Sequence, residues 1–260
     1  MKIGILCTDI YKKAKEIKEY ILNRYDAISI KKKKDVKNID AFVVLGGDGF
    51  MLRALHNYYE FDIPFFGLNY GNIGFLLNNL NCEKVDLIEK IENSTSITIN
   101  PLKNEIININ KKEFIDYSFN ELTLIRSMYK TCNINIKINS KYRLKNYVGD
   151  GLIICTPTGS AAYNSSVGGS IIPHTSNNVI LSTISPFRPR TFKSIILQND
   201  NELEFEINYF KDRKINAFID YIEYKNIIYA KTKVEKNINT KLLFDIDMPF
   251  DEKIMKEQFL

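Results

Sequence analysis

An acidic side chain stands among glycines in the segment Gly46-Gly47-Asp48-Gly49. The apolar run 41–45 precedes it, so the sequence predicts a buried strand, a tight turn and the start of a helix. Glycines at the carboxyl end of such a strand let the backbone approach a ligand, and free N–H groups at a helix start bind phosphate oxygens. Because Asp48 repels a bare phosphate, the loop indicates phosphoryl chemistry involving a metal ion or a substrate hydroxyl. The same residue types also form ordinary turns, which the loop alone leaves open.

A second group of polar residues lies a hundred positions later. An acid between glycines, Gly149-Asp150-Gly151, leads into the apolar run 152–155 and then into a polar turn. The turn supplies hydroxyl and amide groups beside small residues that leave room for a flat ring or a sugar. It therefore predicts a nucleoside pocket formed by Thr156, Thr158, Gly159, Ser160, Ala161, Ala162, Tyr163 and Asn164.

Together with Asn120-Glu121 and the run 67–76, Gly-Leu-Asn-Tyr-Gly-Asn-Ile-Gly-Phe-Leu, these segments resemble the bacterial NAD kinases. The match spans most of the chain, and the stiff basic loop 185–190 resembles the alphaproteobacterial members. The resemblance implies phosphorylation by ATP of the 2'-hydroxyl on the adenosine ribose of NAD, giving NADP. It also implies Mg²⁺ or another divalent cation carried with ATP, no metal site of the protein itself, and a homo-oligomer, either a dimer or a tetramer.

Roles for individual residues follow from this resemblance. Asp48 is expected beside the ribose hydroxyl, which it orients and whose proton it accepts late in a loose transition state. Arg53, one helical turn further, is placed to reach a phosphate, although an exposed helix arginine is equally consistent. The expected binding residues are Gly46, Gly47 and Gly49 at the phosphates, Asn120 and Glu121 at the NAD, and Asp150, Thr158, Ala161, Ala162, Tyr163, Asn164, Ser165 and Ser166 around the nucleoside.

Several positions depart from the family pattern. Ala161 replaces a usual threonine, Phe50-Met51 replaces the threonine that usually follows the acidic loop, and Ile219-Asp220-Tyr221 has tyrosine where an Asp-Gly turn is usual. Two rival functions stay open. Another kinase with this glycine loop, acting on a lipid or a sugar phosphate, needs a different pocket, and a noncatalytic dinucleotide sensor has no need of Asp48. The roles of His56 and His174, and polyphosphate or NADH as substrates, are also left open.

Composition bounds the class of protein. The chain has 260 residues, 45% of them hydrophobic, and a net charge of +5, which is too small to indicate nucleic acid binding. Its four cysteines lack the spacing of a zinc site or a redox pair. No apolar run approaches the roughly 20 residues that span a membrane, and the N-terminus is strand-like, so a cytoplasmic protein without membrane partners is expected.

Apolar periodicity predicts the architecture. Strands at 2–7, 41–45 and 64–69 alternate with helices at 10–25 and 49–59, which indicates a parallel sheet. A helix at 83–92 follows, and residues 94–235 are rich in strands without helical spacers. The expected fold class is an α/β N-terminal Rossmann-like domain plus an all-β sandwich C-terminal domain. The expected bounds are 1–95, 96–238 and a returning segment 239–260, with a strand at 241–244 and a helix at 251–259.

Overall fold

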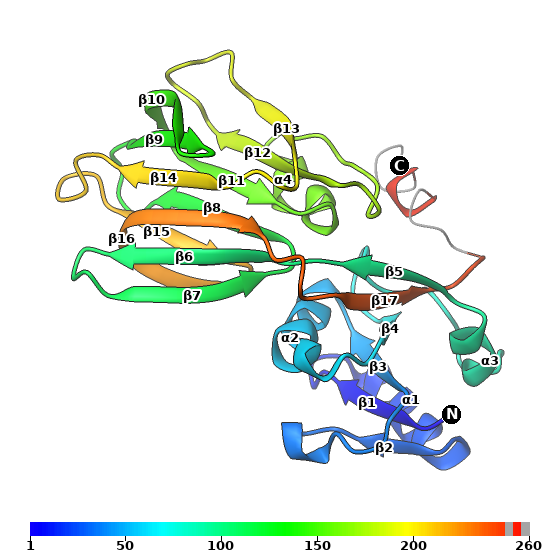
Figure 1. Ribbon diagram of the computed structural model, residues 1–260. Coiled ribbons are helices and arrows are strands. Elements are labelled where there is room, and N and C mark those ends of the chain that lie inside the picture. The colour runs from blue at the N-terminus through cyan, green and yellow to red at the C-terminus, as the bar shows by residue number, and fades with distance from the viewer. Residues whose placement is uncertain (248–251, 256–260) are drawn as a thin grey trace. The chain divides into compact units, whose positions relative to one another are not determined.

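The computed structural model describes residues 1–247 and 252–255, and the chain divides into two compact units. Unit 1 comprises Met1–Ile99 and the C-terminal segment that begins at Ile238, and unit 2 comprises Asn100–Asn237. Figure 1 shows that the chain leaves unit 1 through one strand and returns to it through the neighbouring strand. Unit 2 is therefore inserted into unit 1. Within the described residues, no helix is long and apolar enough to cross a membrane.

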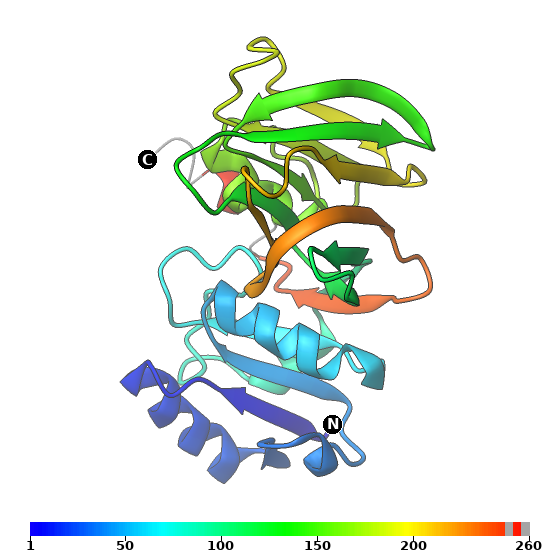
Figure 2. The same ribbon diagram turned by 90° about the vertical axis from the view of Figure 1, so that its left-hand side faces the viewer.

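Unit 1 is built on a sheet whose strand order is β2-β1-β3-β4-β17-β5. All neighbouring strands are parallel except β5, which runs antiparallel to β17. Helices α1 and α2 lie on opposite faces of the sheet (Figure 2). The strands are β1 (Ile3–Cys7), β2 (Ala27–Ser29), β3 (Ala41–Gly46), β4 (Phe65–Asn69), β5 (Thr95–Ile99) and β17 (Thr240–Phe244), and the helices are α1 (Lys12–Arg24), α2 (Asp48–Tyr58) and α3 (Leu87–Glu92), with short 3₁₀ turns at Lys33–Asp35 and Tyr59–Phe61.

Hydrophobic patterning explains these elements. Helix α1 buries Ala14, Ile17 and Ile21, which recur along one face and pack on the sheet. Every residue of β3 is buried, as is typical of a central parallel strand covered on both faces. The chain passes from β1 to β2 on one side, whereas β3 pairs with the other side of β1. The carboxyl ends of β1 and β3 thus form a topological switch point, where open α/β sheets bind ligands.

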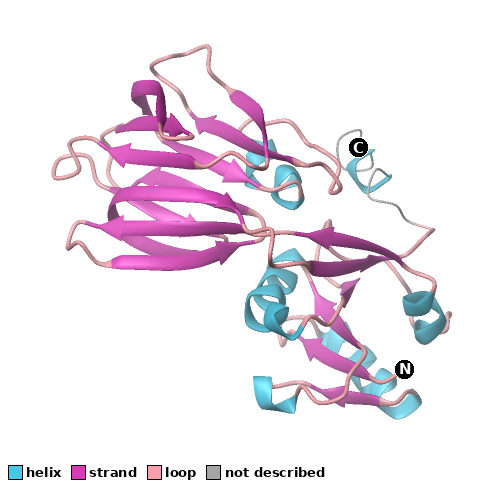
Figure 3. Ribbon diagram, in the orientation of Figure 1, coloured by secondary structure: helices cyan, strands magenta, loops and turns pink. Residues whose placement is uncertain are grey.

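Unit 2 consists almost entirely of antiparallel strands (Figure 3). In the described chain, eleven strands form one continuous sheet that folds into a sandwich around a core of aliphatic side chains. After β11 the chain makes a 3₁₀ turn, Thr158–Ala161, and the short helix α4, Tyr163–Ser166. The strands are β6 (Leu102–Asn108), β7 (Glu113–Ser118), β8 (Glu121–Arg126), β9 (Cys132–Ile138), β10 (Lys141–Gly149), β11 (Gly151–Cys155), β12 (Asn178–Ile184), β13 (Ser194–Gln198), β14 (Leu203–Ile207), β15 (Ile215–Ile219) and β16 (Ile222–Val234).

The predicted fold class is confirmed, as are the predicted strands at 2–7, 41–45 and 64–69. The helix predicted at 83–92 begins only at Leu87, because the Asp86 side chain accepts the backbone N–H of Ile88 (2.9 Å) and caps it there. The strand predicted at 241–244 is β17. Of the helix predicted at 251–259, residues 252–255 are helical and the others lie outside the described residues.

Candidate functional site

Asp48 is the first residue of α2, and backbone N–H groups of one loop hold its carboxylate. Gly74 and Phe75 donate to Oδ2 (3.2 and 3.1 Å), and Leu76 donates to Oδ1 (2.8 Å). The positive end of the α2 dipole also favours a negative charge at this position. A carboxylate has about four acceptor positions, so about one remains for a further hydrogen bond. Asp48 is thus fixed in orientation and still able to accept a proton donor.

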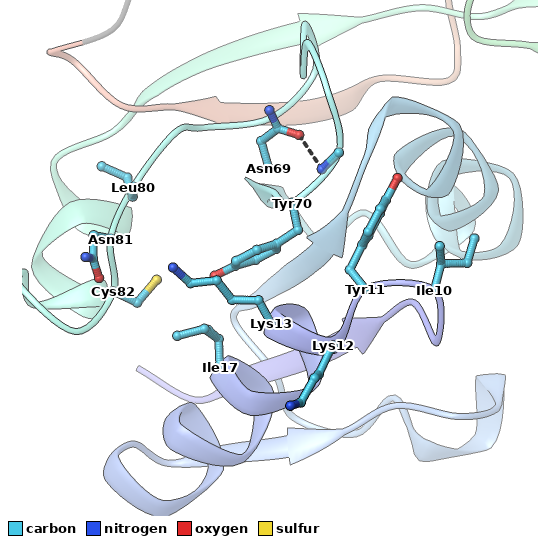
Figure 4. A pocket seen from close by; sticks show the side chains of 11 residues that line it. Ile10, Tyr11, Lys12, Lys13, Ile17, Asn69, Tyr70, Leu80, Asn81 and Cys82 are labelled. Atoms are coloured by element: carbon cyan, nitrogen blue, oxygen red, sulfur yellow. Dashed lines mark hydrogen bonds between the residues drawn. The ribbon is translucent and has the colours of Figure 1, made fainter.

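The loop that binds Asp48 has its own internal support. Asn69 accepts the N–H of Gly71 on Oδ1 (2.9 Å) and donates through Nδ2 to the Ile73 carbonyl (3.1 Å). Figure 4 shows the first of these bonds. Gly74 has a φ of +76°, and a Cβ there would lie 2.4 Å from Cγ of Asn69, so only glycine fits. Tyr70 donates its N–H to the Gly46 carbonyl (2.8 Å), which ties this loop to the loop that carries Asp48.

The three glycines around Asp48 have different environments. A Cβ on Gly46 would lie 2.8 Å from the Phe50 ring, whereas one on Gly47 would lie 3.5 Å from Cα of Gly71, an ordinary contact. At Gly49, a Cβ would meet no heavy atom of the described chain within 4 Å. Gly47 is the N-cap of α2 and makes no side-chain cap there, so the first N–H groups of the helix are suited to bind an anion.

Two cavities border the carboxyl edge of the sheet in unit 1. One, of about 530 Å³, lies on the α1 side and is lined by Tyr11, Lys13, Asn69 and Tyr70 among others (Figure 4). Burial raises the pKa of Tyr70. The second, of about 370 Å³, lies between β1, β2 and α2, and its wall includes Arg53 with further lysines. Arg53 therefore faces a cavity beside the switch point.

In unit 2, a second aspartate binds the backbone ahead of β8. Both oxygens of Asp220 accept N–H groups, from Phe119 (2.8 Å), Asn120 (2.9 Å) and Glu121 (3.0 Å). Oδ1 of Asn120 and Oε2 of Glu121 are buried without a hydrogen-bond partner in the described structure. Burial, followed by the charge of Asp220, raises the pKa of Glu121 to about 8. Buried polar atoms without partners are rare in folded proteins, so this pair is a candidate ligand contact.

The turn after β11 is packed against Asn120. The hydroxyls of Thr156 and Thr158 both donate to the Phe119 carbonyl, at 2.6 and 2.7 Å. A Cβ on Gly159 would lie 2.3 Å from the carbonyl oxygen of Asn120, so glycine alone permits this approach. The structure thus brings Asn120, Glu121 and the Thr158–Ala161 turn together. Of the predicted pocket residues, Thr156 and Thr158 use their hydroxyls in hydrogen bonds within unit 2.

The Asn164 side chain organises the same segment. It donates to the carbonyls of Ser160 and Ser170 (both 2.9 Å) and accepts the Ser182 hydroxyl (2.6 Å). Its amide is fully buried and its donors and acceptor are in use, so it holds this segment together rather than presenting a free amide. Around it, Ala161 is buried, Ala162 is half-buried, the Ser165 hydroxyl binds helix carbonyls, and Tyr163 and Ser166 are exposed.

Asp150 is separated in space from Asn120, Glu121 and the Thr158–Ala161 turn. It precedes β11, whereas the Thr158–Ala161 turn follows that strand, so the length of β11 separates them. Its carboxylate accepts Nε of Arg126 at 2.6 Å, at the far end of β8. Sequence reasoning noted Asp220 only as a departure from a turn pattern. The available signal was an acid in the two-residue connection between β15 and β16, where its side chain can reach the start of β8.

Both units of the chain resemble known proteins in sequence. Two family models match the chain, the ATP-NAD kinase N-terminal domain over residues 2–93 and the ATP-NAD kinase C-terminal domain over residues 119–233. The NAD kinase of Rickettsia typhi is 36% identical over 224 residues, which cover 86% of this chain and 87% of that protein. That of Rickettsia bellii is 35% identical over 225 residues, covering 86% and 88%.

Two solved structures share the fold. Yeast NADH kinase complexed with NADH matches with a TM-score of 0.82 at 18% identity, over 100% of this chain and 87% of that chain. An NAD kinase from Archaeoglobus fulgidus in complex with ATP matches with a TM-score of 0.75 at 18% identity, over 100% and 97%. The two family models together cover most of each unit, and the Rickettsia relatives cover most of the chain. The chain therefore belongs to the ATP-NAD kinase family and is an enzyme of that family.

Proposed function

We propose that this protein transfers the γ-phosphoryl group of ATP to the 2'-hydroxyl on the adenosine ribose of NAD, giving NADP and ADP. The observation that carries the proposal is the Asp48 carboxylate, held by three backbone N–H groups with one acceptor position left, beside a glycine loop. A hydroxyl that donates to this position is oriented for attack. The loop itself offers phosphate-binding N–H groups, as a kinase requires.

The reaction is a single displacement at phosphorus. The 2'-oxygen bonds to the γ-phosphorus while the bond from that phosphorus to the bridging oxygen of ADP breaks. The hydroxyl proton passes to Asp48 late in this step, when bond formation has made the hydroxyl acidic. General-base assistance of this kind contributes about 10² to 10⁴ in rate. A divalent cation such as Mg²⁺, carried with ATP as part of the substrate, would neutralise the charge of its phosphates.

Unit 2 supplies the recognition of NAD in this proposal. This assignment is supported by Oδ1 of Asn120 and Oε2 of Glu121, which are buried without hydrogen-bond partners in the described structure and would gain them from bound NAD. The Thr158–Ala161 turn and the following residues to Ser166 form the wall against the nucleoside. Asp150 is included as a binding residue on the family resemblance alone.

The donor nucleotide belongs to unit 1 in this proposal. Its phosphates bind the N–H groups at the start of α2, at the switch point between β1 and β3. The two cavities at this edge each carry basic residues, Lys13 in one and Arg53 in the other, that favour an anionic nucleotide. We further propose a cytoplasmic enzyme of NADP biosynthesis that forms a dimer or tetramer, which light scattering of the purified protein tests.

The deciding experiment is NADP formation by the purified protein with NAD, ATP and Mg²⁺, run beside Asp48→Asn. We expect turnover by the wild type and its loss in the variant. Binding of NAD without turnover by either protein, with polyphosphate also failing as a donor, would instead indicate a dinucleotide sensor. Turnover of a lipid or sugar phosphate in preference to NAD would overturn the assigned acceptor.

A further inference from the structure

A lysine near the C-terminal end of the described chain is buried beneath the loop that binds Asp48. Lys253 is 6% exposed and lies in the short helical stretch 252–255 of unit 1. Its Nζ donates to the carbonyl of Gly74 (3.4 Å) and to the carbonyl of Leu77. The same ammonium group lies 4.8 Å from the centre of the Phe244 ring, a cation–π distance. Two carbonyls and an aromatic face thus surround this charge.

The carbonyl of Gly74 connects Lys253 to Asp48. It belongs to the same peptide group as the N–H of Phe75, which donates to Oδ2 of Asp48 at 3.1 Å. Hydrogen bonds in such a chain polarise one another, so a cation on the carbonyl makes the N–H on the other side a stronger donor. The second contact, to Leu77, fixes the other end of the loop, one residue beyond the third donor, Leu76.

The charges around Lys253 determine when it is protonated. Burial lowers its pKa to about 8, against the opposing attraction of Asp48 and Asp245, the two carboxylates that act on it. Asp245 is shared with Lys90 of α3, whose Nζ lies 3.1 Å from Oδ1 of Asp245 and 2.6 Å from an oxygen of Asp247. The ammonium form of Lys253 therefore predominates at neutral pH and is lost in mildly alkaline solution.

We propose that Lys253 is a positioning residue for phosphoryl transfer, whose ammonium group holds loop 74–77 so that its three N–H groups fix the Asp48 carboxylate. The inference rests on the proposed function of Asp48. Lys253 touches neither substrate in this proposal, so its removal lowers kcat and leaves the KM values for NAD and ATP nearly unchanged. Misplacement of a catalytic group by about 1 Å costs up to roughly 100-fold in rate, which bounds the expected loss.

The test compares the pH dependence of kcat in the wild type, Lys253→Arg and Lys253→Met. The wild type should lose kcat as the pH rises through about 8, because the charged form of Lys253 is the supporting one. Arginine stays charged, so Lys253→Arg should retain activity and move this loss to higher pH. Lys253→Met should lower kcat about 10- to 100-fold at pH 7. Circular dichroism and thermal unfolding establish that each variant is folded.

Lys90→Met is the matched control, because it removes an anchor of the same C-terminal segment without touching loop 74–77. Its kcat at pH 7 should equal that of the wild type. A wild-type kcat that is flat between pH 7 and 9.5, or an arginine variant with the unchanged alkaline loss, would overturn the inference even if Lys253→Met does not fold. An inactive Asp48→Asn beside a fully active Lys253→Met overturns this inference alone, whereas an active Asp48→Asn overturns the proposed role of Asp48.

Discussion

Unit 1 and unit 2 contain the same hydrogen-bonding motif, but the motif positions the aspartate in one unit and the loop in the other. In each, one aspartate accepts the N–H groups of three consecutive residues, Gly74 to Leu76 at Asp48 and Phe119 to Glu121 at Asp220. In unit 1 the loop holds the carboxylate in place, because the three donating residues are a glycine and two apolar residues with no polar side chain of their own. In unit 2 the acid holds the loop backbone in place, and two of the donating residues, Asn120 and Glu121, carry polar side chains.

The difference shows how to identify the functional partner in such a motif. At Asp220, the buried atoms that lack hydrogen-bond partners in the described structure belong to the loop, as Oδ1 of Asn120 and Oε2 of Glu121. At Asp48, the remaining acceptor position belongs to the aspartate itself. In the proposed function, the substrate contacts are assigned to Asp48 itself in unit 1 and, in unit 2, to the buried oxygens of Asn120 and Glu121 that lack partners.

The largest effect is expected from Asp48→Asn. An asparagine places an NH₂ group against at least one of the three donating N–H groups, so it loses both the proton acceptor and part of the loop contact. We expect kcat to fall by about 10² to 10⁴ and the unfolding free energy to fall by about 1–3 kcal/mol. Steady-state NADP formation and urea unfolding measure both. Asp40→Asn, an exposed acid ahead of β3, is the control, and an equal loss of kcat there would discredit the role of Asp48.

Asp220→Asn should affect binding rather than chemistry. The NH₂ group of the asparagine would face at least one backbone N–H group, which loosens the backbone of Asn120 and Glu121. We expect the KM for NAD to rise about tenfold, which corresponds to about 1.4 kcal/mol. The kcat at saturating NAD should stay within about threefold of the wild type, since kcat is insensitive to uniform binding losses. Asp200→Asn, an exposed acid of unit 2, should change neither value. A large drop in kcat with an unchanged KM would show that the two aspartates do not divide their roles in this way.

Glu121→Gln sharpens the comparison through the pH dependence of stability. The pKa of Glu121 is raised from 4.5 to about 8, so the folded state holds this proton more tightly than the unfolded state. The contribution of Glu121 to the free energy of unfolding is present at low pH. It declines as the pH rises from about 4.5 to 8, by at most about 1.4 kcal/mol per pH unit. Glutamine removes this slope. Urea unfolding of both proteins at pH 5, 6, 7 and 8 measures the difference, and parallel curves would contradict the raised pKa.

The smallest effects are expected from one exposed cation in the lining of each of these cavities of unit 1. Arg53→Ala and Lys13→Ala each remove one charge, and exposed ionic contacts contribute up to about 1 kcal/mol. The KM for ATP should rise about two- to fivefold in the variant whose cavity receives the donor, and less in the other. The effect should shrink at high salt, because the charge is exposed. Unchanged KM values for ATP in both variants would show that ATP binds in neither cavity.

The fold was predictable where one physical signal dominates. The apolar run 41–45 and the periodic apolar face of residues 12–24 specified β3 and α1. The strand β2, with only three half-buried residues, gave no such signal. Strand β5 has mostly polar residues, and its place in unit 1 depends on pairing with β17, a long-range contact that local patterns do not contain.

In the candidate site, sequence motifs single out the residues that we propose to act, but they do not reveal the residues that support them. Asp48, Asn120 and Glu121 stand in motifs with a recognisable spacing, whereas Asp220 and Lys253 act through contacts with segments far away in the sequence. Lys253 stands among charged residues that predict an exposed helix. Asn164 and Thr158 were correctly grouped with the turn, but the hydrogen bonds that occupy their side chains depend on tertiary packing.

The return of the chain into unit 1 has a consequence for synthesis on the ribosome. Strand β17 fills the place between β4 and β5, yet it emerges only after the whole of unit 2. Until then β4 and β5 have no common partner, so the nascent sheet of unit 1 lacks the strand next to its edge strand β5, while unit 2, continuous in sequence, can already fold. Translation of unit 1 thus starts first, but unit 2 is the first of the two that can be completed. A nascent chain stalled before residue 240 would expose the edge of β4, a known route to misassembly.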